Sequence, residues 1–307
     1  KAVSEHSTEE VHPGQLVTVC IKAVNRHVIF LGKQQFQIGV AYLNTPGNEK
    51  EMLQCDGVTE KVQQTMAEFS PKHCGIAQID IEKVFLQDYL GLIGTQKNFR
   101  GGCQLAVLPE PVLSTRIRTG MEKQQEYRYS AVADDDSDIL DLRAFRPGDN
   151  LNHIHWNLSL RTDDLIVRQY GEQIDVKKVI LVDLSILNTA QYRSRMDAVY
   201  TAVASIANLY VENEVNTLIL AWNGQSAEYL EVHDRTELNR AMIRLMQIPC
   251  SSRAGEHAAA VYLKDIEAQG QQVLFVTAGS YENNKVRIVN VEKIQLQELI
   301  DELWEKI

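Results

Sequence analysis

Several features that mark the commonest functional classes are missing from this chain of 307 residues. No stretch reaches the roughly 18 consecutive apolar residues that a membrane-spanning helix needs. Lysine and arginine form no basic stripe, and the formal net charge is -10. A general nucleic-acid binder is therefore excluded, because such proteins need clustered positive charge to displace counterions from phosphates. The hydrophobic content of 44% instead indicates a globular chain long enough for two domains.

The cysteines are few and show no paired spacing. The chain has five cysteines, an odd number, with no C-x-x-C motif. They are Cys20, Cys55, Cys74, Cys103 and Cys250. The pattern predicts reduced thiols and neither a disulfide scaffold nor a zinc site. We therefore expect this part of the protein to lie in a reducing compartment.

The usual catalytic motifs are absent as well. There is no G-x-S-x-G, no P-loop and no G-x-G-x-x-G, so acyl transfer, nucleotide hydrolysis and dinucleotide chemistry lack their usual scaffolds. The acidic run at 134–138 lacks the turn glycine and distant glutamate of a calcium loop, which predicts a solvated loop.

What the chain does have is a change of pattern along its length. Between residues 15 and 108, short alternating segments separated by Gly, Pro and Asn predict an antiparallel sandwich of immunoglobulin-like type. Residues 57–73 fit a short helix as well as a strand, and both stay open. Residues 109–120 have the composition of an exit linker.

After residue 170 the pattern of apolar residues changes and predicts strands that alternate with helices. Buried-type strands are predicted at 175–185, 216–223, 271–279 and 285–291, and helices at 195–213, 235–248, 255–270 and 294–307. Such alternation predicts a Rossmann-like, doubly wound parallel sheet, because parallel neighbours need crossover connections. We expect two domains: a β-sandwich over residues 1–115 and an α/β domain over residues 116–307.

The α/β domain includes an unusually dense polar segment at 138–170, between two strand-like stretches. It contains the turn sequence R-P-G-D at 146–149 and the motif H-x-H-W at 153–156. Such density marks a site or a specific interface, since a simple crossover would use ordinary turn residues. The candidate residues are Arg143, Arg146, Pro147, Gly148, Asp149, His155, Trp156, Arg161 and Arg168.

This segment also resembles a known family. Residues 142–170, LRAFRPGDNLNHIHWNLSLRTDDLIVRQY, resemble the signature of the bacterial domain of unknown function family 58, with Asn152 and Leu160 departing from its usual Arg and Ala. Upstream, Gly75, Asp88, Gly91 and Leu92 match a second family segment. The resemblance is strongest from residue 70 to residue 185.

The resemblance implies a fold and a role. The family's C-terminal part looks like a von Willebrand factor A domain, its members commonly carry an N-terminal transmembrane pair, and they often accompany MoxR-type AAA ATPases. By that resemblance we expect a non-enzymatic interaction or assembly module whose partner is such an ATPase or its client. It would be membrane-anchored through a segment that precedes Lys1, with the soluble region on the cytoplasmic side.

A von Willebrand factor A metal site would need D-x-S-x-S after the first core strand, a threonine from another loop and a later aspartate. Only Asp183 and Ser185 match, because Leu187 replaces the second serine and Ala278 stands at the acidic position. We therefore expect no cofactor, and Mg²⁺ is not favoured. Asp183 is expected to cap the following turn or to pair with an arginine of the 138–170 segment.

Alternative functions follow from the same residues. Arg146 and Asp149 are expected to fix the loop, and Arg161 to bind a partner carboxylate or Asp183. Equally, the segment could join the two domains. The rival function is a metal-dependent hydrolase or nuclease that uses Asp149, His153, His155 and Asp183, since H-x-H on an extended segment points both rings to one face. An extracellular metal-dependent adhesion module is a third option, which the reduced cysteines disfavour.

Overall fold

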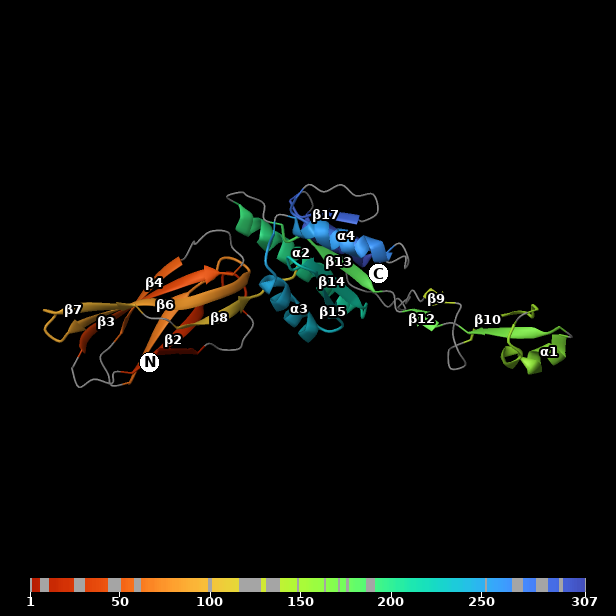
Figure 1. Cartoon of the computed structure of the whole chain (residues 1–307), viewed down its shortest axis with the longest axis horizontal. Helices are drawn as coiled ribbons and strands as arrows, with labels where there is room; N and C mark the ends of the chain where they lie inside the picture. Colours follow the sequence, from red (N-terminus) through yellow and green to blue (C-terminus); the bar gives the residue numbers. More distant parts are fainter. Residues whose placement is uncertain are drawn as a thin grey trace. The chain divides into compact units, whose positions relative to one another are not determined.

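The computed structural model describes residues 2–5, 11–24, 31–43, 51–57, 62–98, 101–115, 128–130, 139–147, 149–162, 164–170, 172–174, 177–185, 191–251, 253–266, 273–279, 287–292 and 295–306 (Figure 1). The chain forms two compact units. The larger unit combines residues 1–117 with residues 178–307, and the signature unit comprises residues 118–177.

The N-terminal part of the larger unit consists of two antiparallel sheets. The first has the order β1-β2-β5, from β1 (Ala2–Glu5), β2 (Val17–Val24) and β5 (Val62–Phe69). The second has the order β4-β3-β6-β7, from β4 (Glu51–Gly57), β3 (Leu31–Tyr42), β6 (Gly75–Asp88) and β7 (Gly94–Asn98), and β8 (Gly102–Val107) also pairs with β6. The strands that the sequence indicated between residues 15 and 108 are thus present. The immunoglobulin-like arrangement stays a prediction.

A shared hydrophobic core joins these two sheets. Ile21 of β2 and Phe69 of β5 belong to the same buried cluster as Phe36, Ile38 and Ile79 of the second sheet. In β5, Ala67 and Phe69 are buried while the residues between and before them are exposed. Burial at every second residue is typical of a strand, and the structure has residues 62–69 as the strand β5. The sequence had been compatible with a helix here as well.

The C-terminal part of the larger unit is a five-stranded sheet of order β15-β14-β13-β16-β17. Its strands are β13 (Lys178–Val182), β14 (Thr217–Trp222), β15 (Ala227–Val232), β16 (Val273–Thr277) and β17 (Arg287–Asn290). Its helices are α2 (Tyr192–Glu212), α3 (Arg235–Gln247), α4 (Ala254–Ile266) and α5 (Leu296–Trp304). Strand β13 pairs in parallel with β14 and β16, and β16 with β17, whereas β15 is antiparallel to β14. The mixed α/β fold with several sheets is confirmed, and likeness to a von Willebrand factor A domain stays a prediction.

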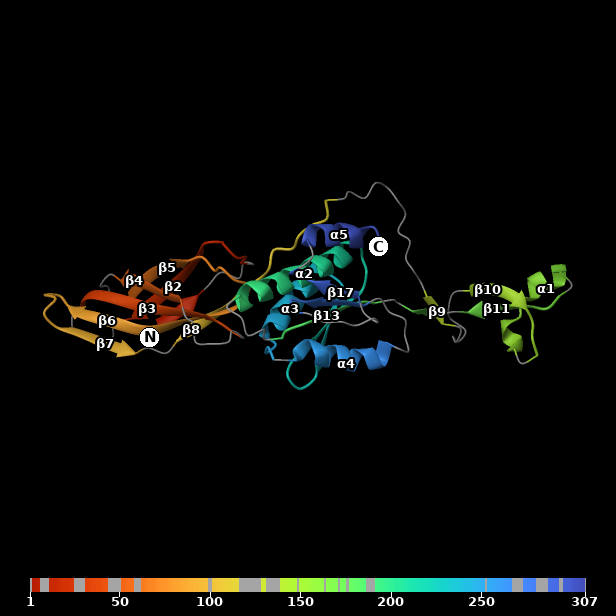
Figure 2. The same ribbon diagram turned by 90° about the horizontal axis from the view of Figure 1, so that it is seen from above.

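Helices cover both faces of this sheet, as Figure 2 shows. Ile180 and Val182 of β13 belong to one core cluster with residues of α2, α3 and α5. Val179 and Leu181, which point the opposite way, belong to a second cluster with residues of α4. Burial on both faces explains why the strand reads as the continuous apolar run KVILV.

Polar contacts tie the N-terminal strands to α2. Asp197 of α2 accepts a hydrogen bond from the backbone N–H of Cys74 at 2.8 Å, and its other oxygen lies 2.7 Å from Nδ1 of His73. The described part of the exit linker is bound as well, since Asp301 of α5 accepts from Ser114 Oγ and from the N–H of Thr115. These contacts organise the larger unit where its two parts of the sequence meet.

The signature unit is built on two short antiparallel pairs. They are β10 (Ile139–Ala144) with β11 (Ile166–Tyr170), and β9 (Arg128–Ser130) with β12 (Glu172–Ile174). A 3-10 turn (Leu151–His153) and helix α1 (Trp156–Thr162) connect β10 to β11. Ile154 and Val167 are buried and bridge each other, which gives the unit a small core.

Over the residues that the structure describes, no helix combines the length and the apolar character needed to span a bilayer.

Candidate functional site

The R-P-G-D turn is closed by an arginine and an aspartate six residues apart. Both Nη atoms of Arg143 donate to the two carboxylate oxygens of Asp149, each at 2.7 Å. Asp149 also accepts from the backbone N–H of Arg146 at 2.7 Å. The hydrogen bonds from Arg143, followed by that from Arg146, hold the pKa of Asp149 down at about 2. A bidentate pair of this kind fixes the turn in one geometry.

The turn residues contribute in different ways. Arg146 supplies its backbone to the turn, and the guanidinium that binds Asp149 comes from Arg143 on β10. Arg146 and Pro147 are exposed. Gly148 lies outside the described residues.

The histidine motif leads into helix α1. His155 precedes the helix, and its Nδ1 accepts from the N–H of Leu158 at 3.2 Å, so this ring nitrogen caps the first turn. Asp149, which the rival hydrolase function requires, is already bound by Arg143. Within the described ranges, no three His, Cys, Asp or Glu side chains gather as a metal centre.

Helix α1 presents large apolar side chains to solvent. Trp156 is 59% exposed and Leu160 is 81% exposed. The two are four residues apart and therefore lie on the same side of the helix. Arg161, in the last turn, is exposed too, whereas Arg168 of β11 is half-buried. Three further exposed apolar residues of this unit are Leu142, Leu151 and Leu165.

The second candidate location is the carboxyl end of β13 in the larger unit. Oδ1 of Asp183 accepts from the N–H of Ser185 at 2.9 Å and also from the Ser185 hydroxyl. Oδ2 accepts from the hydroxyl of Thr277, at the end of β16, at 2.5 Å. Thr277 is fully buried, and its Oγ1 accepts from the N–H of Gly279. Asp183 thus caps its own turn, as one of the two sequence expectations had it, and joins two neighbouring strand ends.

Helix α4 approaches this aspartate closely. A Cβ atom placed on Gly255 would lie 2.7 Å from Oδ1 of Asp183. A side chain at residue 255 would therefore collide with the carboxylate, so glycine is required by the close packing.

The residues around Asp183 are a poor fit for a divalent cation. Among the described residues, they offer the Asp183 carboxylate and the hydroxyl oxygens of Ser185 and Thr277, whose hydrogens are donated to that carboxylate. Ala278 is buried and has no side-chain oxygen, and Leu187 lies outside the described residues. Mg²⁺ needs near-octahedral oxygen coordination and gives up water reluctantly. One negative charge with two hydroxyls does not meet that requirement.

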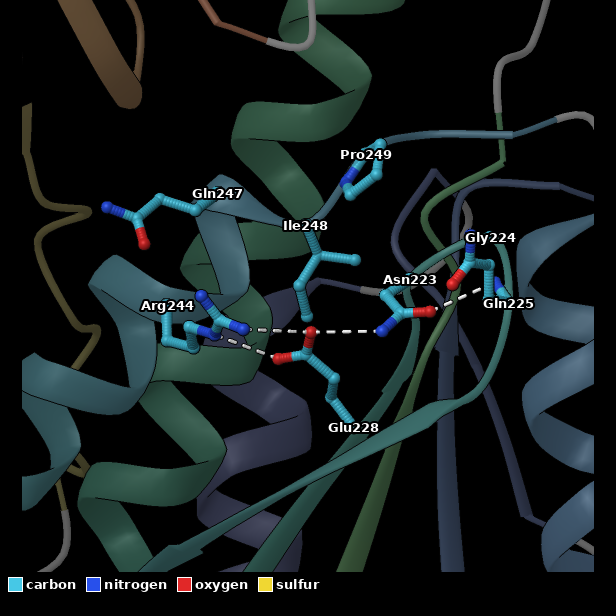
Figure 3. Close-up of a pocket in the computed structure, with 8 residues that line it drawn as sticks. All are labelled: Asn223, Gly224, Gln225, Glu228, Arg244, Gln247, Ile248 and Pro249. Atoms are coloured by element: carbon cyan, nitrogen blue, oxygen red, sulfur yellow. Dashed lines mark hydrogen bonds and ion pairs between the residues drawn. The ribbon is translucent and has the colours of Figure 1, made fainter.

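A groove that the sequence did not indicate lies beside the same sheet (Figure 3). It has a volume of about 480 Å³ and is bordered by the β14–β15 turn, by α3 and by Ile248 and Pro249. Glu228 inside it accepts from Arg244 Nε at 2.9 Å and from Asn223 Nδ2 at 3.2 Å. Three polar side chains of the groove, Asn223, Glu228 and Arg244, thus bind one another.

The five cysteines are free. Burial raises the pKa of Cys74 to about 12 and also raises the pKa of Cys250. These two thiols are protonated near neutral pH, which makes them weak nucleophiles.

Comparison with protein families supports the resemblance drawn from the sequence. The profile of the family described as "Protein of unknown function DUF58" matches residues 141–290. The matched region includes the R-P-G-D turn, helix α1 and the sheet from β13 to β17. A comparison with curated proteins gives no match.

Proposed function

We propose that this chain is a non-enzymatic interaction or assembly module that works with a MoxR-type AAA ATPase. In this proposal it is the soluble region of a membrane-anchored protein and faces the cytoplasm. The observation that carries the proposal is the exposed apolar surface of α1 beside a turn held rigid by a bidentate ion pair.

The exposed residues have the chemistry of a binding surface. Tryptophan and arginine are enriched among the residues that dominate binding energy at protein interfaces. Trp156 and Leu160 offer large apolar area on one side of α1, and the exposed Arg161 follows them. The preceding Arg143–Asp149 pair holds the loop before the helix in place, which lowers the entropy that binding must overcome.

The Asp183 cluster supports contact over metal-assisted chemistry. Its carboxylate already accepts hydrogen bonds from the Ser185 and Thr277 hydroxyls, and the described residues contain no group of three His, Cys, Asp or Glu side chains that could hold a cation. The buried Cys74 thiol and the half-buried Cys250 thiol, both with raised pKa values, are not activated nucleophiles either.

Binding to a purified MoxR-type ATPase encoded in the same genome tests the proposal, by interferometry with the immobilised chain. Trp156→Ala/Leu160→Ala should weaken binding at least about tenfold, as expected for interface anchors. Leu16→Ala/Leu113→Ala, at residues 68% and 58% exposed in the larger unit, is the matched control and should leave binding unchanged. Undetectable binding of the wild-type chain, or equal loss in both variants, would rule the proposal out.

Calorimetry separates the rival function. Titration with Mg²⁺ and Mn²⁺ should give no stoichiometric uptake by the wild-type chain. Tight uptake that Asp183→Ala abolishes would favour a metal-dependent hydrolase.

A further inference from the structure

The turn between β6 and β7 displays four large apolar side chains to solvent. Tyr89 is 82% exposed, Leu90 73%, Leu92 79% and Ile93 72%. Figures 1 and 2 both show this turn at the outer end of its sheet. Scattered exposed apolar residues are normal, but four within five positions form a concentrated apolar tip.

The tip is held in a defined conformation. The N–H of Asp88 donates to the carbonyl of Ile93 at 3.0 Å, and the N–H of Gly91 donates to the carbonyl of Asp88 at 3.1 Å. The Asp88 side chain accepts from the N–H of Ile93 at 2.9 Å. Gly91 has a φ of 71°, a left-handed conformation that suits glycine. The apolar side chains therefore project from a turn that is organised before it meets anything.

Charge is distributed along the hairpin in a characteristic way. No charged residue occurs from Tyr89 through Gln96, and the one carboxylate at the tip's base, Asp88, is bound to the turn itself. Two lysines follow the tip, Lys97 on β7 and Lys83 on β6. Lys83 pairs with Asn98, the residue next to Lys97, so the two lysines lie at nearly the same level of the hairpin. At about 3.3 Å per residue, Lys97 lies roughly 10 Å along the strand from Gly94.

A third lysine lies on the adjoining strand. Lys33 of β3 precedes Gln34, which pairs with Leu86 of β6, and its ammonium is 3.3 Å from Asp56. All three strands that lead toward the tip thus carry a lysine.

We propose that the β6–β7 tip inserts into the surface of a lipid bilayer that contains anionic phospholipid. A convex, uncharged apolar tip with a tyrosine suits the boundary between headgroups and acyl chains, which accepts a protruding shape without needing a matching pocket. Lysines about 10 Å behind such a tip come to the depth of the phosphates. This inference does not depend on the proposed ATPase partnership.

Vesicle flotation with the full chain tests the proposal. The probes are vesicles of phosphatidylcholine alone and vesicles in which about a third of the lipid is phosphatidylglycerol. The wild-type chain should float with the anionic vesicles. Leu90→Asp/Leu92→Asp should reduce the bound fraction at least about tenfold, because each substitution places a carboxylate at the interface.

Two further variants make the result specific. Leu16→Asp/Met66→Asp introduces the same charge at residues 68% and 66% exposed, outside the β4-β3-β6-β7 sheet, and should bind as the wild type does. Replacing Lys83 and Lys97 by Gln should weaken binding to anionic vesicles by about fivefold for each lysine. Circular dichroism should show the same fold in every variant, since the replaced leucines lie outside the core.

Insertion is distinguished from surface adsorption by depth. Leu92→Trp should add an emission component that brominated lipid quenches, beyond the signal of the three native tryptophans. The proposal fails if the wild-type chain stays unbound with anionic vesicles, if Leu90→Asp/Leu92→Asp floats equally well, or if the new tryptophan is not quenched. Concentration-dependent self-association that this double variant abolishes, without vesicle binding, would assign the tip to a second copy of the chain instead.

Discussion

Asp197 of α2 and His73, 124 residues earlier in the chain, lie 2.7 Å apart between Oδ2 and Nδ1. The other oxygen of Asp197 accepts from the N–H of Cys74. Burial raises the pKa of Asp197, and the hydrogen bonds from His73 and Cys74 oppose that rise. The carboxylate is thus removed from water, and its hydrogen bonds with His73 and Cys74, in the loop before β6, offset the cost of that desolvation.

Removing this carboxylate should destabilise the larger unit. Asp197→Ala leaves the Cys74 N–H without its acceptor and should cost about 1–3 kcal/mol in the free energy of unfolding, the usual penalty for a buried unsatisfied donor. Asp197→Asn, which keeps one carbonyl oxygen, should cost less. Urea unfolding followed by circular dichroism measures both, and equal stability of Asp197→Ala and wild type would contradict the role given to this contact.

Thr277 should be needed for its hydroxyl and not for its shape. Thr277→Val keeps the volume but removes the donor to Asp183 and the acceptor for the Gly279 N–H, so we expect a loss of about 1–3 kcal/mol. Thr277→Ser keeps the hydroxyl and should retain more stability than the valine variant. Thermal and urea unfolding of the two variants side by side provide the comparison.

A side chain at residue 255 should be destabilising although residue 255 lies in a helix. Gly-to-Ala changes in helix interiors usually stabilise by about 0.5–1 kcal/mol. At Gly255 the new Cβ would lie 2.7 Å from Oδ1 of Asp183, so we expect a net loss of about 1–3 kcal/mol. Gly94→Ala is the control, because its Cβ would be 3.8 Å from the nearest atom, an ordinary contact. A stabilised Gly255→Ala variant would show that α4 lies farther from Asp183.

The Arg143–Asp149 pair predicts a pH dependence in the signature unit. Because the folded-state pKa of Asp149 is about 2, below its ordinary value of 3.8, its stabilising effect is fully present above pH 3.8. The effect should be lost as the pH falls from 3.8 through about 2. Carbon-13 NMR titration of the carboxyl should show this midpoint, and Arg143→Gln should raise it toward 3.8. Arg161→Gln, at a residue outside the turn, should leave the midpoint unchanged.

The periodic elements of the α/β part could be predicted from the sequence. The run KVILV is apolar at every position except its first, which is typical of a strand buried on both faces. Helices α3 and α5 fall within predicted helical segments, whereas α2 begins three residues and α4 one residue before the predicted start. Strand β15, AEYLEV, was missed because edge strands are partly solvated and carry charges. Residues 62–69 were ambiguous because two glutamines interrupt the apolar alternation.

The site was harder to predict. Asp183 and Ser185 were identified because they follow a recognisable strand, but Thr277 was not. Threonine is a common strand residue, and nothing local signals a contact with a residue 94 positions away. The pairing of Asp149 with Arg143, and not with another nearby arginine, likewise depends on the β10–β11 geometry. At the β6–β7 tip, the apolar letters YLGLI gave no sign that they would be exposed, because the same letters occur in buried strands.

The larger unit is assembled from two stretches of chain with the signature unit encoded between them. During synthesis the N-terminal sheets emerge first, yet the carboxylate that clamps His73 and Cys74 belongs to a helix translated only after residue 191. The contact of Asp197 with His73 and Cys74 can therefore form only after the whole of the intervening segment has left the ribosome. Until then Cys74 and Ile76, which end up in the core of the α/β part, have no neighbours there to cover them.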